Sequence, residues 1–318
     1  MKLFLLALIL SVALPLSANQ IADWSRFAAA GEADGQTFSE LSANITAGFE
    51  TDLDKAAALY YWVTHNVAYD TKMVRKMLKS GMAPERITLE EAERRMEEQA
   101  SVALLQRKGV CQNYARLYRR LAMAAGLECE FIAGHSRGYF SRAGTLGVGH
   151  AWNAVRIDGE WQLLDATWGA GGVNAKQKFE FKFRPGYFMP HAASFSYNHF
   201  PRDEKWQLLE TPVTEEQFLA QPGTGPGFVE HGLYNLNHQE SKLVLKRGNP
   251  LAVSFAAGLP VNEVFCVNMT VRKQIPCTVS TAEGLTTVSL DEKTVRNMEL
   301  SLMTMEQEVL VSYRLSVR

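Results

Sequence analysis

Residues 109–127 read GVCQNYARLYRRLAMAAGL. Apolar residues recur in it at helical spacing, at Tyr114, Leu117, Leu121 and Ala124. Gly126 suits a left-handed C-cap, so the pattern predicts a helix that begins at Cys111. Unpaired N–H groups and the helix dipole favour an anion at such a position, which suits a thiolate nucleophile.

Cys111 alone does not establish catalysis, because an unpaired cysteine more often fills space in a core. A cysteine nucleophile needs a histidine to take its proton and an acceptor to orient that histidine. The three side chains need to be close in space only. A catalytic role for Cys111 therefore requires that the rest of the chain supplies both partners.

A predicted hairpin supplies a histidine and a carboxylate. Residues 149–157 and 160–167 have strand character, and Asp158-Gly159 between them is a strong signal for a two-residue turn. In that register Ile157 faces Glu160, Trp152 faces Asp165 and His150 faces Thr167. His150 and Asp165 then share one face as diagonal neighbours, roughly 7 to 8 Å apart at the backbone and within reach of one hydrogen bond.

Each partner also has a structural interpretation. His150 could be a hydrogen-bonded core histidine, and Asp165 could be an acceptor that caps a turn. These structural interpretations are less convincing when the two residues are considered together. An apolar strand such as residues 161–164 has little reason to end in an inward carboxylate unless a cation or a donor lies there.

Three stretches resemble the transglutaminase-like superfamily. Residues 109–127 look like its nucleophile helix, GHAWN at 149–153 resembles its histidine strand, and WQLLDATW at 161–168 resembles its aspartate strand. They occur in the family order Cys, His, Asp, and the likeness covers roughly residues 52–170. A later segment, HFPRDEKWQLL at 199–209, is similar to one that follows the core in the kyphoscoliosis peptidase branch.

The resemblance implies an α+β fold with a papain-like core, in which a helix that carries the cysteine packs on an antiparallel sheet. It implies that Cys111 is the nucleophile, His150 the general base and then acid, and Asp165 the residue that orients the imidazole. The reaction would be acyl transfer from an amide through a thioester. Water as acceptor would make a peptidase or amidase, which we favour, and an amine would make a cross-linking transglutaminase.

The family also includes members that have lost activity. The alternative function is therefore a non-catalytic binding or scaffold protein at the cell envelope. For an enzyme, the oxyanion would need about two donors. The backbone N–H of Cys111 is the first candidate, and the side chain of Tyr69 or Gln112 is the second.

No cofactor or metal site is expected. No run of Asp and Asn at loop-ligand spacing suggests calcium. His191 and His199 are eight residues apart with Asp203 beyond, but aromatic neighbours indicate a packed loop and make a metal site improbable. Tryptophans 152, 161 and 168 could line a substrate groove, although cross-strand packing is the commoner role of such residues.

Composition limits the classes of partner. The 318 residues are 47% apolar, which excludes disorder as the main state, and a formal charge of −1 provides no global field for nucleic acid. Four cysteines are too few for a disulfide scaffold. Cys266 and Cys277 could pair in an oxidising compartment, but no turn signal fixes their separation.

The chain divides into five predicted segments. They are a signal peptide at 1–18, an N-terminal arm at 19–50, a transglutaminase-like core at 51–210, a Pro- and Gly-rich linker at 211–228, and an all-β sandwich at 229–318. The apolar run near the start is too short to span a membrane. We expect a secreted or periplasmic protein, without membrane insertion after cleavage, whose partner is a protein or peptide substrate, with a cell-wall peptide as one candidate.

Overall fold

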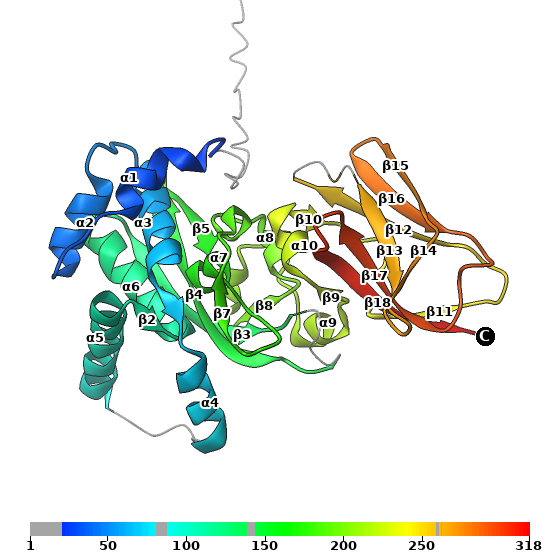
Figure 1. Cartoon of the computed structure of the whole chain (residues 1–318), viewed down its shortest axis with the longest axis horizontal. Coiled ribbons are helices and arrows are strands. Elements are labelled where there is room, and N and C mark those ends of the chain that lie inside the picture. Colours follow the sequence, from blue (N-terminus) through cyan, green and yellow to red (C-terminus); the bar gives the residue numbers. More distant parts are fainter. Residues whose placement is uncertain (1–20, 81–87, 139–143, 259–260, 262) are drawn as a thin grey trace, which may run out of the picture.

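The computed structural model describes residues 21–80, 88–138, 144–258, 261 and 263–318 (Figure 1). The predicted signal peptide at 1–18 lies outside these residues. One end of the molecule contains most of the helices and a small sheet, and the other end, which includes the C-terminus, contains only strands (Figure 1). Across the described residues, none of the helices combines the length and the apolar character that crossing a membrane requires.

The first part is an α+β core, as predicted. Its antiparallel sheet has the order β5-β4-β3-β8. The strands are β3 (Cys129–Ser136), β4 (Val148–Ile157), β5 (Glu160–Leu164) and β8 (His199–Pro201). Helix α6 (Cys111–Ala124) packs on β3 and β4, and it also contacts α3 (Asp52–Asn66) and α5 (Leu89–Gln106). The helix that carries the cysteine therefore lies on the sheet that carries the histidine.

Helix α6 begins at Cys111, which confirms the sequence prediction. The N–H of Val110 donates to Oδ1 of Asn113 (2.9 Å), so a side chain of the first turn holds the residue before the helix. At the other end Gly126 has a φ of +85°, the left-handed conformation expected after the last turn. Tyr114, Leu117, Tyr118 and Leu121 form its buried face.

Two further helices of the core have side-chain caps. Thr51 caps α3, because its hydroxyl accepts the N–H of Asp54. Thr88 caps α5, and that helix ends in a left-handed Arg107. The next two residues form β2 (Lys108–Gly109), which pairs in parallel with β1 (Ala68–Tyr69).

The hairpin between β4 and β5 has the predicted register. Ile157 pairs with Glu160, and the ladder continues to the pair Asn153–Leu164. Asp158 and Gly159 both have positive φ, 50° and 86°, as a type I′ turn requires. Strand β5 ends at Leu164 and not at residue 167, because Asp165 leaves the ladder to cap α7 (Ala166–Ala170). The predicted pairs Trp152–Asp165 and His150–Thr167 are consequently not formed as ladder pairs.

The segment predicted as an N-terminal arm contains helices. From residue 21 onward it forms η2 (Trp24–Phe27), α1 (Ala28–Gly31) and α2 (Phe38–Thr46). Phe27, Leu41 and Ile45 are fully buried against the core. These few apolar residues are spaced widely in a polar sequence, which is why composition alone suggested an arm.

The Pro- and Gly-rich segment 211–228 also has secondary structure. It contains α9 (Glu215–Ala220), β9 (Gly223–Thr224) and the first residues of α10 (Pro226–Glu230). Strand β9 pairs with β18 (Val309–Val317), which belongs to the C-terminal part. The division of the chain into domains itself remains a prediction.

The C-terminal part consists of two sheets, which agrees with the predicted sheet-rich region. One has the order β10-β12-β16-β15, and the other has the order β11-β18-β17-β13-β14. The strands not yet given are β10 (Leu233–Tyr234), β11 (Lys242–Leu245), β12 (Leu251–Ala257), β13 (Val264–Asn268), β14 (Lys273–Ile275), β15 (Thr278–Ala282), β16 (Leu285–Leu290) and β17 (Met298–Thr304). Cys266 and Cys277 are free thiols here and make side-chain contact, so the structure contains no disulfide between them.

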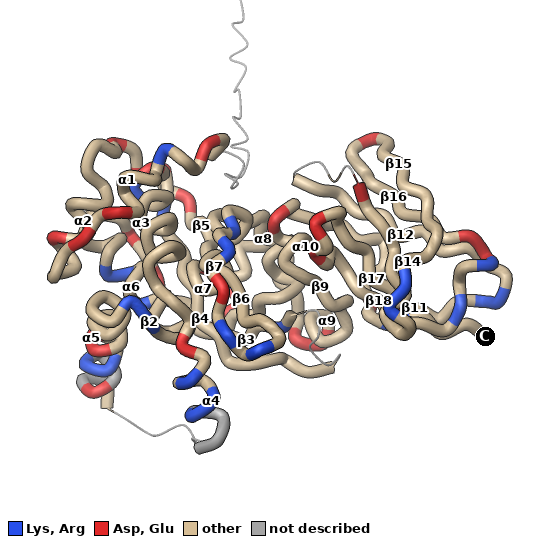
Figure 2. The backbone as a smooth tube through the Cα atoms, in the orientation of Figure 1, with Lys and Arg blue, Asp and Glu red and all other residues tan. Residues whose placement is uncertain are grey.

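The remaining short elements connect the core. They are α4 (Thr71–Ser80), β6 (Gly171–Val173), β7 (Phe179–Phe181), η3 (Pro185–Tyr187), α8 (Ala192–Phe195) and η4 (Glu204–Gln207). Both parts of the chain contain basic and acidic residues (Figure 2), consistent with the formal charge of −1.

Gly109 is required by close packing beside the cysteine helix. A Cβ at this position would collide with Cβ of Asn113, the residue that holds the helix start. We expect Gly109→Ala to lower the unfolding free energy by about 1–3 kcal/mol, the usual cost of overpacking. Gly172→Ala is the control, because a Cβ there meets nothing within 4 Å. Equal denaturation midpoints for the two variants would show that residue 109 has room for a methyl group.

Candidate active site

Cys111 is the first residue of α6 and is partly exposed. The pair β1–β2 fixes the chain immediately before it, since Tyr69 pairs with Gly109 and the N–H of Asp70 donates to the carbonyl of Gly109 (2.8 Å). The sulfur therefore lies at a helix N-terminus, where the amide dipoles favour negative charge.

His150 on β4 is buried and lies between Cys111 and Asp165. Its Nε2 is 2.7 Å from Oδ2 of Asp165, and the thiol of Cys111 is close enough to contribute to raising the pKa of the ring. Since Asp165 occupies Nε2, Nδ1 is the ring nitrogen left for the sulfur. The structure thus joins His150 to Asp165 by a hydrogen bond and places Cys111 near the same imidazole.

The protonation of His150 follows from its neighbours. Burial acts to lower the pKa of His150, but the charge and hydrogen bond of Asp165, together with Cys111, outweigh it and raise the pKa to about 10. The imidazole of His150 is therefore protonated at neutral pH. Because the ordinary value is 6.5, the stabilisation from this pair is complete below pH 6.5 and is lost as the pH rises through about 10.

Asp165 is fully buried and accepts four hydrogen bonds. Its Oδ1 accepts the backbone N–H of Thr167 (2.8 Å) and of Trp168 (3.1 Å), at the start of α7. Its Oδ2 lies 2.7 Å from His150 and 3.0 Å from His199. Burial opposes ionisation, but the charge of His150 and these donors hold the pKa of Asp165 well below its usual range.

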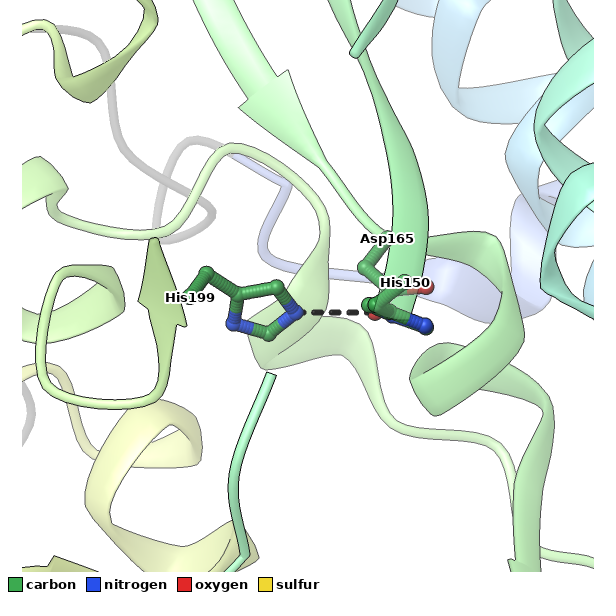
Figure 3. Close-up of side chains that lie close together, drawn as sticks. All are labelled: His150, Asp165 and His199. Atoms are coloured by element: carbon green, nitrogen blue, oxygen red, sulfur yellow. Dashed lines mark hydrogen bonds and ion pairs between the residues drawn. The ribbon is translucent and has the colours of Figure 1, made fainter. Parts of the chain in front are cut away.

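His199 on β8 is the member of this cluster that sequence reasoning missed. Figure 3 shows its ring pointing at the place where Asp165 and His150 meet. The sequence suggested a packed aromatic loop, and His199 does stack on Phe195, with ring centroids 3.7 Å apart. The available signal was its place in the 199–209 segment that accompanies the family core, but no spacing rule connected it to Asp165.

The three atoms that His150, Asp165 and His199 direct at one another lie within 4.8 Å, so this set could in principle hold a metal ion. The same atoms are already used in the two hydrogen bonds to Oδ2, and all three side chains are buried. Hydrogen bonding alone therefore accounts for the arrangement. His191 lies elsewhere, stacked on Tyr234 with centroids 4.3 Å apart.

The three tryptophans have different environments. Trp168 is partly exposed, and its ring centroid lies 5.7 Å from that of His150, so it borders the cluster. Trp152 is buried beside His199. Trp161 packs edge-on against Trp206 and has only a packing role in the contacts it makes. These contacts therefore do not support a groove lined by all three tryptophans.

Of the two oxyanion candidates, Tyr69 is the better placed. Burial raises the pKa of Tyr69, and the charges of Cys111 and Asp165 act in the same direction, so its phenol keeps its proton beside the sulfur. Gln112 is exposed on the surface of α6. Tyr69 is thus a candidate O–H donor near the reacting atom, whereas nothing directs Gln112 there.

The chain matches a known protein family over the residues that form this site. A family model of the transglutaminase-like superfamily matches residues 39–166, a range that includes Cys111, His150 and Asp165. The chain contains a transglutaminase-like domain. The resemblance noted from the three motifs is therefore confirmed.

The chain is also similar in sequence to known proteins. The chain is 28% identical over 233 residues to mouse kyphoscoliosis peptidase and 29% identical over 233 residues to the human protein, covering 72% of this chain in each case. It spans about a third (33%) of the length of those relatives. A solved structure of a TGase is 18% identical, covering 52% of this chain and 36% of that one, with a TM-score of 0.31, too low to support an argument.

The charge of Asp165 should control the protonation of His150. In a Cys111→Ala protein, nuclear magnetic resonance titration should give a pKa of His150 well above 6.5, because Asp165 remains. Adding Asp165→Asn should bring it below 6.5, since burial then acts without an opposing charge. Asn can still cap α7, so the fold should persist. Equal values in the two proteins would show that Asp165 does not set the protonation of His150.

Proposed function

We propose that this chain is a cysteine-dependent acyl-transfer enzyme that acts on amide bonds of proteins or peptides. The observation that carries the proposal is that Cys111 lies near the imidazole of His150, which is hydrogen-bonded to Asp165. A partly exposed sulfur, a buried imidazole and a buried carboxylate in this order are what nucleophilic catalysis by cysteine needs.

The proposed reaction has two steps. The sulfur of Cys111 attacks the amide carbonyl, and the proton held by His150 passes to the departing amine as the C–N bond breaks, leaving a thioester. A water or amine then attacks the thioester while His150 takes its proton, and the sulfur leaves. The N–H of Cys111 and the hydroxyl of Tyr69 are the proposed donors to the oxyanion.

We propose hydrolysis over cross-linking, which makes the protein a peptidase or amidase. The curated relatives named kyphoscoliosis peptidase support this choice. An exported location, with cell-wall peptides as one candidate substrate, rests on the apolar N-terminal sequence alone. The alternative is a binding or scaffold protein that retains the fold, and the complete Cys, His and Asp set argues against it.

Cys111 should be the most reactive thiol of the chain. Iodoacetamide at neutral pH should label it selectively, because Cys129 and Cys266 are buried. His150→Ala should reduce that labelling by at least about tenfold through loss of the group that holds the proton. Peptide mass spectrometry gives the site, and the partly exposed Cys277 is the internal control. Equal labelling of Cys111 and Cys277 would favour the binding protein.

The acyl acceptor can be determined with a glutamine-rich protein and a tagged primary amine. Hydrolysis predicts cleavage or deamidation of the protein without incorporation of the tag, and Cys111→Ala abolishes the reaction. Incorporation of the tag that depends on Cys111 would show that an amine is the acceptor and would replace the peptidase proposal with a transglutaminase.

A further inference from the structure

His199 places a second imidazole on the carboxylate that orients the first. Oδ2 of Asp165 lies 2.7 Å from Nε2 of His150 and 3.0 Å from Nε2 of His199 (Figure 3). The two rings come from different strands, β4 and β8, and approach the same oxygen. Since Thr167 and Trp168 already supply both donors to Oδ1, His199 completes the set of four.

The backbone is arranged to deliver this ring. His199 pairs with Ser136 across β3 and β8, and Pro201 pairs with Gly134. A Cβ at Gly134 would collide with the carbonyl oxygen of Phe200 and with the ring of Trp152. The glycine therefore allows β8 to come close enough for His199 to reach Asp165.

His199 is neutral in this position. Burial lowers the pKa of His199 to about 4, and the positive charge of His150 acts in the same direction, against the attraction of Asp165. A neutral ring has one N–H, so donating from Nε2 leaves Nδ1 as an acceptor. His199 thus contributes a hydrogen bond and no second positive charge.

Asn198 matches that tautomer once its amide oxygen and nitrogen are exchanged. Its amide lies against Nδ1 of His199, with a 2.5 Å separation from Oδ1, and its Nδ2 has no hydrogen-bond partner in the described part of the chain. Rotating the amide by 180° brings Nδ2 to Nδ1 and satisfies both groups, because an N–H then meets a lone pair. The resulting order of donation is Asn198 to His199 to Asp165.

We propose that His199 is a positioning residue, whose Nε2–H fixes Oδ2 of Asp165 so that this carboxylate holds the imidazole of His150 against Cys111. This inference rests on the roles given to Cys111 and His150 in the proposed function. Without the donor, one lone pair of a buried anion loses its partner, and the rings of Phe195 and Trp152 that pack on His199 offer no N–H at that place in the contacts they make. Oδ2 is then held by His150 alone, and the orientation of the carboxylate is less firmly fixed.

Two substitutions at His199 separate hydrogen bonding from packing. His199→Gln keeps an N–H near the place of Nε2 but loses the stacked ring, and His199→Phe keeps the ring against Phe195 but has no donor. The rate of iodoacetamide labelling of Cys111 at neutral pH should fall by about tenfold or more in the Phe variant, the size expected when one hydrogen bond to a charged group is lost. The Gln variant should retain most of the rate.

His191→Phe is the matched control, because it makes the same change at a histidine that stacks on Tyr234 and should label like the unaltered protein. A packing role predicts the opposite order, with the Phe variant unaffected and the Gln variant impaired. That order, equal loss in two folded variants, or no change in either would overturn the proposal.

A spectroscopic measurement covers the cases in which a variant does not fold or Cys111 of the unaltered protein is unreactive. In ¹⁵N-histidine-labelled Cys111→Ala protein, His199 should be a neutral ring protonated at Nε2 and unprotonated at Nδ1. Protonation at Nδ1 would overturn the inference. Lack of reactivity at Cys111 with the expected tautomer at His199 would instead count against the proposed function.

Discussion

The buried negative charge of Asp165 is the constraint on which the rest of the site depends. An unpaired carboxylate in a protein interior costs several kcal/mol, so its four acceptor positions must be filled. Two backbone amides of α7 and two imidazoles fill them. Strand β5 consequently ends at Leu164, α7 begins at once, and strands β4 and β8 must both present a histidine to the same point.

One carboxylate keeps its two histidines in opposite protonation states. The pKa of His150 is raised to about 10 and that of His199 is lowered to about 4. The site needs only one positive charge to balance Asp165, and once His150 carries it, a second charge on buried His199 would be repelled. This asymmetry gives each ring a separate task, because His150 can transfer a proton while His199 can only donate a hydrogen bond.

The sequence was most informative where a local rule determined geometry. The turn at Asp158-Gly159 fixed the hairpin register, and the apolar periodicity with its C-cap glycine fixed where the cysteine helix lies. It was least informative where a few residues carry long-range contacts. Buried Phe27 and Leu41 were hidden in a polar stretch, and His199 could not be linked to Asp165 because the pairing of β8 with β3 has no local signature.

A small activated ester tests directly, without knowledge of the substrate, whether the sulfur of Cys111 takes up an acyl group with the help of His150. On mixing with p-nitrophenyl acetate, the protein should release about one equivalent of nitrophenol in a burst, and intact-mass and peptide analysis should find a hydroxylamine-labile acetyl group on Cys111, absent after His150→Gln. Absence of the burst, or acetylation confined to lysines, would contradict the account.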